Sequence, residues 1–417
     1  MNTNKRWLYL ITATLTLLFL GLIYAWSIFR TPFSAIFPDW SVSQISMTFT
    51  ISITFFCLGG FVGGLLSKKL SAKVRLIISA VLLFTGFFVV STLDAANSAA
   101  SLNKLYIFYG IFGGGGVGLA YNVVISTVNR WFPDKVGLAS GMMMMGFGLG
   151  GLILGAVVNS LITSIGIFSV FKFLSFAIGA ICLVAAIIIR LPRDEESKMI
   201  ALHIKRVEKS DEKTIIEKEN PSKDFTPSDM LKTPSFWFFV IWAVLLNSAG
   251  LLVINSAANI SVAFGGTAVL GMIVSLFNGA GRIIAGNNFD RFGRRTATLI
   301  NNVFMAIAGL LLTAGGLTGS FVLIVIGLIF VGLSYGGCPT ITSAFVNKAY
   351  GPKHFSINFS IANFSLIPAA TIGPMISAKL LEAANGNYNT SFFAIIGFSV
   401  AAAVMMVLLN ISNKKQD

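Results

Sequence analysis

The stretch LFNGAGRIIAGNNFDRFGRR, residues 276–295, combines two features that decide how the chain folds. Arg282 stands inside an apolar run, where an unpaired charge at the centre of a bilayer costs about 2.5 to 3.5 kcal/mol on insertion scales. A glycine-punctuated segment of mixed charge begins shortly afterwards at Gly286. The stretch therefore predicts a membrane helix that holds a deep charge and ends in a turn at the membrane surface.

Composition places the rest of the chain in a bilayer. Hydrophobic residues make up 55% of the 417 positions, charged residues make up 11%, and the mean hydropathy is +0.82. Soluble domains average about a quarter charged residues. A net charge of +14 would favour nucleic-acid binding in a soluble protein, but here the basic residues stand at helix ends and in one loop. We therefore expect a lipid bilayer around the chain and no nucleic-acid partner.

Twelve apolar runs are long enough to cross about 30 Å of hydrocarbon. They lie near residues 7–29, 43–66, 74–94, 104–128, 137–163, 168–190, 236–262, 268–288, 296–316, 321–347, 355–381 and 390–410. The predicted fold class is therefore an all-α membrane protein with twelve transmembrane helices in two six-helix halves. The predicted domains are an N-terminal half at 1–190, a cytoplasmic linker loop at 191–234 and a C-terminal half at 235–417.

The basic residues orient these helices. If the N-terminus is cytoplasmic, the short inner segments hold fifteen Lys and Arg residues, whereas the outer segments hold four, namely Arg30, Lys104, Lys172 and Lys379. An excess of positive charge marks the cytoplasmic side of a membrane protein. We therefore expect both termini and the 191–234 loop to be cytoplasmic, in a protein of the plasma membrane.

The two halves also repeat. The segment that begins at Gly64 corresponds to the one that begins at Gly286, and residues 130–135 correspond to residues 350–354, at offsets of 222 and 219 residues. Two landmarks at nearly one offset indicate a duplicated six-helix unit. Parallel repeats of this kind place a substrate between the halves, near the middle of the membrane.

Arg282 is the principal candidate for binding. No Asp or Glu falls in the middle of an apolar run, which disfavours a buried carboxylate relay. An arginine keeps its proton in proteins, so we expect Arg282 to meet a bound anion. The alternative is an arginine that is bonded to backbone carbonyls or that extends toward the helix end. Asn278 lies four residues earlier on the same helix face and can donate to a carboxylate, or it can be a packing amide.

Other polar and aromatic side chains complete the candidate substrate site. Tyr121 and Asn122 are polar groups in the inner part of the fourth helix, and Tyr24, Tyr335 and Phe364 are aromatic groups that can shape an apolar cavity. The three cysteines and two histidines show no spacing typical of a metal site or a disulfide framework. We therefore expect no metal, no cofactor and no catalytic residues.

The arrangement of six helices, a loop and six helices resembles the major facilitator superfamily. So does the motif Gly-x-x-x-Asp-Arg-x-Gly-Arg-Arg, while its first-half copy departs from the pattern because Lys68 stands at the acidic position and Ser71 at the second glycine. This resemblance implies a loop that takes part in conformational switching. Its residues are Gly286, Asp290, Arg291, Gly293, Arg294 and Arg295.

Finer matches resemble the oxalate/formate antiporter family, which is related to the monocarboxylate porters. They are YAWSIF at 24–29, GLAY at 118–121, WFPDKVGLASG at 131–141, FNGAGR at 277–282 and YGPKHFSINF at 350–359. In the monocarboxylate porters an arginine on the eighth helix engages the carboxylate. The resemblance implies that role for Arg282.

Two departures from these relatives concern charge. The oxalate-exchanging member uses a second cation on the eleventh helix, where this chain has Leu366 and no Lys or Arg anywhere in 355–378. Animal proton-coupled monocarboxylate porters carry an aspartate at the place of Asn278. One positive group matches one carboxylate better than two.

The sequence therefore predicts a secondary active transporter of a small organic anion, a monocarboxylate of the formate, lactate or pyruvate type. It would work by alternating access, as proton symport or as anion exchange, and as a monomer. An oxalate:formate antiporter is the alternative. A membrane sensor or channel on the same scaffold is more remote, because one buried charge makes no charge ring and the 191–234 loop is short for a sensor domain.

The predicted orientation can be checked by labelling. In a cysteine-free background, single cysteines at Lys205 and Asn385 should react with an impermeant reagent from opposite sides of the membrane, because the charge pattern places 205 inside and 385 outside. Labelling of both positions from the same side would contradict the twelve-helix topology.

Overall fold

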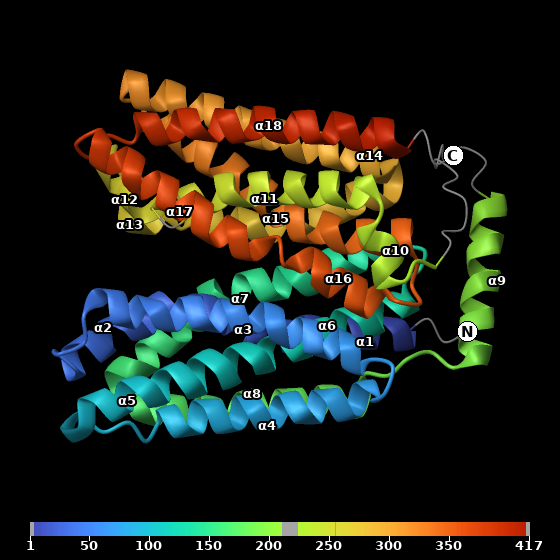
Figure 1. The fold of residues 1–417 in the computed structure, drawn as a ribbon, viewed down its shortest axis with the longest axis horizontal. Helices are drawn as coiled ribbons and strands as arrows, with labels where there is room; N and C mark the ends of the chain where they lie inside the picture. The colour runs from blue at the N-terminus through green and yellow to red at the C-terminus, as the bar shows by residue number, and fades with distance from the viewer. Residues whose placement is uncertain (1–3, 211–223, 255, 414–417) are drawn as a thin grey trace. The chain divides into compact units, whose positions relative to one another are not determined.

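The computed structural model describes residues 4–210, 224–254 and 256–413, and every regular element in these ranges is helical (Figure 1). Eleven helical runs there are long and apolar enough to cross a membrane. One of them, Ile273–Thr318, has 46 residues and a non-helical Gly293 inside it, so it holds two crossings. The predicted all-α membrane fold with twelve transmembrane helices is therefore confirmed.

The helices form two compact units. The first consists of residues 1–133 and 146–210, and the second consists of residues 134–145 and 211–417. Helix α7 (Val136–Ile165) thus gives its first turns to the second unit and the remainder to the first. The half and linker boundaries named from the sequence stay a prediction.

The first unit is built on close helix approaches. Glycines on α6 (Gly114–Val128) present no side chain to α3 (Val42–Leu66). A Cβ on Gly114 would overlap the carbonyl oxygen of Ser52, and one on Gly118 would overlap that of Phe56. This is the packing expected for a glycine-rich membrane helix. The elements of the unit, besides α7, are α1 (Asn4–Leu20), η1 (Gly21–Ala25), α2 (Trp26–Ile36), α3 (Val42–Leu66), α4 (Ala72–Val90), η2 (Ala95–Asn97), α5 (Ser98–Lys104), η3 (Leu105–Gly113), α6 (Gly114–Val128), η4 (Asn129–Trp131), α8 (Ile167–Ile188) and α9 (Asp194–Ser210).

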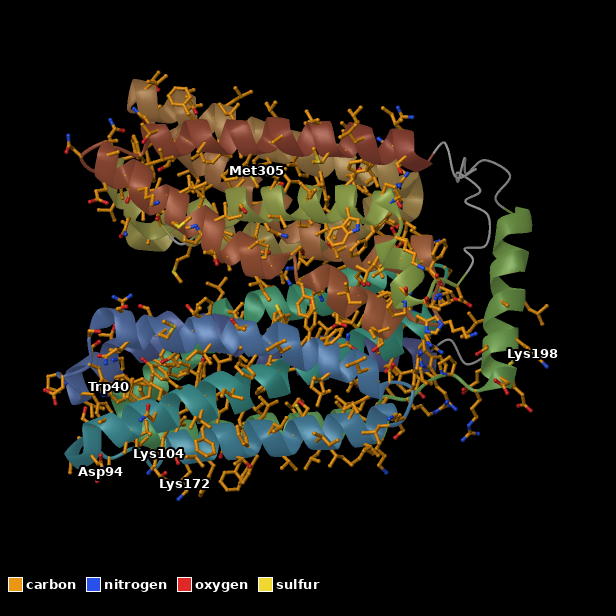
Figure 2. The ribbon with its side chains drawn as sticks, in the orientation of Figure 1. Trp40, Asp94, Lys104, Lys172, Lys198 and Met305 are labelled. Atoms are coloured by element: carbon orange, nitrogen blue, oxygen red, sulfur yellow. The ribbon has the colours of Figure 1, made fainter. Side chains whose placement is uncertain are left out.

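The first unit has two chemically distinct ends. Figure 2 shows Trp40, Asp94, Lys104 and Lys172 gathered at one end of its helices, while Lys198 of α9 lies at the other end. Lys104 and Lys172 are two of the four cations assigned to the outer side, and Lys198 belongs to the loop assigned to the inner side. Residues that the charge pattern assigns to one side of the membrane therefore lie together at one end of the unit.

The second unit contains, besides the start of α7, the elements α10 (Pro227–Leu231), α11 (Pro234–Ile254), α12 (Ala257–Ala263), α13 (Ala268–Gly271), α14 (Ile273–Thr318), α15 (Phe321–Tyr350), α16 (Phe355–Asn363), α17 (Leu366–Ala383) and α18 (Asn389–Asn413). The apolar run expected near 355–381 is broken between α16 and α17. Pro368 explains the break, because its ring clashes with a helical carbonyl four residues earlier, at Phe364. The chain turns there through short hydrogen-bonded steps, such as that from the Ser365 amide to the Ala362 carbonyl at 3.1 Å.

The segment 191–234, expected to be a linker loop, contains helices α9 and α10, and its residues 211–223 lie outside the described ranges. The start of α9 is fastened to the first unit. Arg190 donates two hydrogen bonds of 2.7 Å to the carboxylate of Glu196, and the indole nitrogen of Trp131 donates to the Arg190 carbonyl at 2.7 Å. The Arg190 guanidinium also lies 5.3 Å from the centre of the Trp131 ring.

This pair predicts a pH dependence. The hydrogen bond from Arg190 lowers the pKa of Glu196 from 4.5 to about 2. A lowered carboxyl pKa stabilises the folded form above the unfolded pKa, and that stabilisation is lost as the pH falls through the folded pKa. Proteolysis within 194–210 should therefore stay equally slow from pH 8 to about pH 5. Glu196→Gln should speed cleavage at neutral pH, whereas an unchanged rate would show that the pair does not hold α9.

Candidate functional site

Arg282 lies in the first part of α14 and is 4% exposed. Its Nε donates to Oδ1 of Asn278 at 3.2 Å, and its Nη1 donates to the carbonyl oxygen of Met144 at 2.5 Å. Within the described ranges, no carboxylate lies at salt-bridge distance from Arg282, and its Nη2 makes no hydrogen bond. The side chain is thus a buried cation with one unfilled edge, which is suited to receive an anion.

The structure brings Asn278 and Arg282 together. Because the guanidinium can only donate, the Asn278 side chain presents its oxygen to Arg282 and keeps its nitrogen available for another acceptor. The bond to Met144 shows that the alternative considered for Arg282, a backbone carbonyl partner, is met at one of its nitrogens. A backbone partner at Nη1 and an anion at Nη2 are compatible, since the Met144 carbonyl leaves Nη2 unused.

The first turns of α7 lie directly against this part of α14. A Cβ on Gly137 would overlap the carbonyl oxygen of Gly286, a Cβ on Gly286 would overlap that of Gly137, and one on Gly141 would overlap that of Arg282. The two backbones therefore touch along a Gly-x-x-x-Gly spacing, as in closely packed membrane helices. This approach is what brings the Met144 carbonyl within reach of the guanidinium.

Asp290 fixes the start of α7. Its Oδ1 accepts from the Gly137 amide at 2.8 Å and its Oδ2 accepts from the Leu138 amide at 2.7 Å. These are amides of the first helical turn, which have no partner inside the helix and favour a negative group. The acidic residue of the predicted switching loop thus binds a helix N-terminus.

The rest of the predicted switching loop follows the same part of α14. Gly293 has a φ of 75°, a conformation that favours glycine, and interrupts the helix. Arg294 is buried with its guanidinium 5.9 Å from the centre of the Phe345 ring, whereas Arg291 and Arg295 are exposed. Their role in switching stays a prediction.

Tyr335 and Phe364, also in the second unit, lie on other helices. The Tyr335 ring is 8% exposed and packs against Gly250 of α11, where a Cβ would stand 2.5 Å from the ring. The next residue, Gly336, lies against the backbone of Asn278. Phe364 is half-buried at the break between α16 and α17. Tyr335 is therefore placed one residue from the Asn278 contact.

The remaining candidates belong to the first unit. The Tyr121 ring packs against Phe56 and Phe147, with centroids 5.2 and 4.9 Å apart, and Asn122 is 1% exposed. Tyr24 lies in the 3₁₀ turn η1, and its side chain is outside the described part of the structure. As substrate contacts, all three stay predictions.

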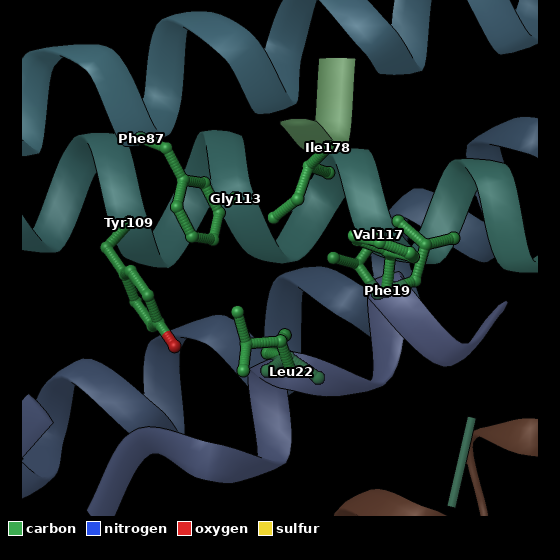
Figure 3. A pocket seen from close by; sticks show the side chains of 9 residues that line it. Phe19, Leu22, Phe87, Tyr109, Gly113, Val117 and Ile178 are labelled. Carbon is green, nitrogen blue, oxygen red and sulfur yellow. The ribbon is translucent and has the colours of Figure 1, made fainter. Parts of the chain in front are cut away.

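A small cavity inside the first unit is chemically different from the Arg282 region. Its lining is apolar except for Tyr109, whose hydroxyl points toward Leu22 in Figure 3 and makes no hydrogen bond within the described residues. Tyr109 lies in η3, a π-helical stretch. Without a charged group in its lining, this cavity is a poor site for an anion.

The contribution of α7 was missed from the sequence. The spacing of Gly137 and Gly141 is a signal of close helix packing that could have indicated it. The hydrogen bond to the Met144 carbonyl could not be predicted, because a main-chain acceptor exists at every position and leaves no mark in the sequence.

The close approach of α7 predicts a stability difference between two glycines. Gly141→Ala should lower the free energy of unfolding by about 1 to 3 kcal/mol, because the added carbon overlaps a backbone atom of α14. Gly397→Ala in α18 is the matched control, since its added carbon would meet no atom within 4 Å, and it should be neutral or stabilising. Thermal unfolding in detergent measures both, and equal midpoints would contradict the α7 contact.

Known proteins that this chain resembles include membrane transporters. The family model described as Major Facilitator Superfamily matches residues 9–257 and 250–416. The chain is 27% identical to the oxalate:formate antiporter of Oxalobacter formigenes, over 97% of this chain and 92% of that protein. It is 23% identical to human monocarboxylate transporter 12, over 90% of this chain and 74% of that protein.

A similar solved structure is that of a proton:xylose symporter bound to 6-bromo-6-deoxy-D-glucose. It matches with a TM-score of 0.75 and 17% identity over 97% of this chain and 96% of the other. At this identity the likeness concerns the fold alone.

Proposed function

Because the chain belongs to the major facilitator superfamily, and is therefore a membrane protein, we propose that it is a secondary active transporter of a small monocarboxylate. Its site would be exposed alternately to the two sides of the membrane. The proposal concerns substrates of the formate, lactate or pyruvate type. Plasma-membrane location, cytoplasmic termini and a monomeric state belong to the same proposal.

One observation carries the proposal: Arg282 is a buried cation whose Nη2 is unused and which no described carboxylate neutralises. A bound carboxylate would meet the planar guanidinium with two parallel hydrogen bonds. Asn278 would hold the guanidinium through its oxygen and offer its nitrogen to the substrate. Tyr335 and Phe364 would bound the cavity in the second unit, and Tyr24, Tyr121 and Asn122 are the candidates from the first.

Coupling would involve either a proton or a second anion. The sequence places no Asp or Glu in the middle of an apolar run, and Asp290 is engaged with the amides of Gly137 and Leu138. A proton would therefore travel with the substrate rather than on a carboxylate relay. Exchange of one anion for another uses the same site.

A second candidate function is oxalate:formate exchange, which the 27% identity to such an antiporter favours. The charge count opposes it. Leu366, at the place of the second cation in that family, begins α17 and carries no charge. A second carboxylate of oxalate would then stay unneutralised in a cavity of low dielectric, which is costly.

The charge count predicts the outcome of equilibrium competition on purified protein. Pyruvate or formate should compete at least about tenfold better than oxalate, or by roughly 1.4 kcal/mol. Leu366→Lys should narrow or reverse this preference by supplying the second cation, whereas Leu366→Met, the uncharged control, should leave it unchanged. Oxalate binding as tight as that of pyruvate in the unmodified protein would refute the charge argument.

Variants of Arg282 test its role in the same assay. Arg282→Ala should abolish competition by every carboxylate with a nearly normal thermal midpoint. Arg282→Lys should retain little binding because the planar fork is lost. Unchanged binding by the alanine variant would place the anion site elsewhere, and a variant that folds poorly would assign Arg282 a structural role.

A further inference from the structure

Met144 contacts two polar groups of the second unit at once. Its carbonyl oxygen accepts from Nη1 of Arg282, and its sulfur is the acceptor, at 3.8 Å, for the hydroxyl of Thr340 in α15. Thr340 is 0% exposed, and its hydroxyl makes no other hydrogen bond within the described ranges. A thioether is a weak acceptor, so Thr340 is a buried donor with an unusually poor partner.

Helix packing places Thr340 beside Arg282. The carbonyl of Asn278 in α14 lies against Gly336 in α15. Arg282 and Thr340 each follow four residues later, one helical turn along the same face of their helices. Both side chains then reach the same residue of α7. The guanidinium and the hydroxyl are therefore two neighbouring donors at one place.

We propose that Thr340 is a specificity-determining residue of the Arg282 site, where it donates to an uncharged oxygen of the substrate next to the carboxylate. The inference rests on the proposed function and deepens it by naming a substrate class. That class is the monocarboxylates with a hydroxyl or oxo oxygen on the second or third carbon, such as lactate, in preference to unsubstituted acids such as propionate.

The chemistry of the two donors supports this assignment. A carboxylate makes charge-assisted bonds to the guanidinium and can reach it at Nη2, which the Met144 carbonyl leaves unused. The Thr340 hydroxyl donates to the Met144 sulfur, a weak acceptor, and gains by donating to an oxygen instead. A substrate oxygen close to the carboxylate supplies that acceptor, whereas a hydrocarbon chain leaves the hydroxyl with its weak sulfur partner. A site built to bond an oxygen discriminates strongly against the analogue that lacks it.

Lactate and propionate make a matched test, because they differ by one hydroxyl. In equilibrium competition the wild-type protein should favour lactate by about tenfold. Thr340→Val keeps the shape of the side chain but removes the donor. It should therefore weaken the binding of lactate about tenfold and the binding of propionate less than about twofold. Thr340→Ser should keep the preference. A ratio that Thr340→Val leaves unchanged, or a loss shared equally by both acids, would overturn the inference.

Further arms keep the test decisive. If Thr340→Val does not fold, Thr340→Ala should show the same fall in the lactate-to-propionate ratio. Met144→Leu removes the sulfur but keeps the carbonyl, and should preserve the ratio. Wild-type protein that binds both acids equally would refute the role of Thr340 while leaving the monocarboxylate function intact. Wild-type protein that binds neither of these acids, and neither formate nor pyruvate, would refute the proposed function itself.

Discussion

The packing of α7 against α14 in the second unit depends on Arg282, a guanidinium buried inside an apolar bundle. Arg282 must have acceptors, because a buried charge without partners is strongly unfavourable. It finds one on its own helix, at Asn278, and one on the main chain of α7. The second partner demands that two backbones touch, and Gly141 and Gly286 make that approach possible. Asp290 then secures the start of α7.

The architecture could be predicted from the sequence because a helix that crosses the bilayer must be apolar over its whole length. Apolar runs of sufficient length, and basic residues at their ends, were enough to predict twelve helices. Arg282 and Asn278 could be paired because their spacing is one helical turn. The helix break at Phe364 could have been predicted from Pro368, although the length and hydropathy of the apolar run do not indicate it. The hydrogen bond from Arg282 to the Met144 carbonyl could not be predicted, since it depends on the tertiary packing of the main chain.

Irregular backbone coincides with several of the residues of interest. Tyr24 lies in a 3₁₀ stretch, Tyr109 in a π-helical stretch, and Phe364 at the break between two helices. Within a membrane, backbone groups released from a regular helix are tolerated where protein buries them or where they line a cavity. The irregular positions of these helices thus indicate where this fold can accommodate polar groups within the membrane.

The hydrogen bond between Arg282 and the carbonyl of Met144 has a consequence for the evolutionary record. Any amino acid at position 144 offers the same carbonyl oxygen, so a substitution there does not require a compensating change at position 282. Methods that infer contacts from correlated substitutions would therefore not detect this hydrogen bond. The constraint falls instead on the small residues, Gly137, Gly141 and Gly286, which hold the oxygen in place. We expect these glycines to be fixed, rather than to covary with the arginine, in descendants of this gene.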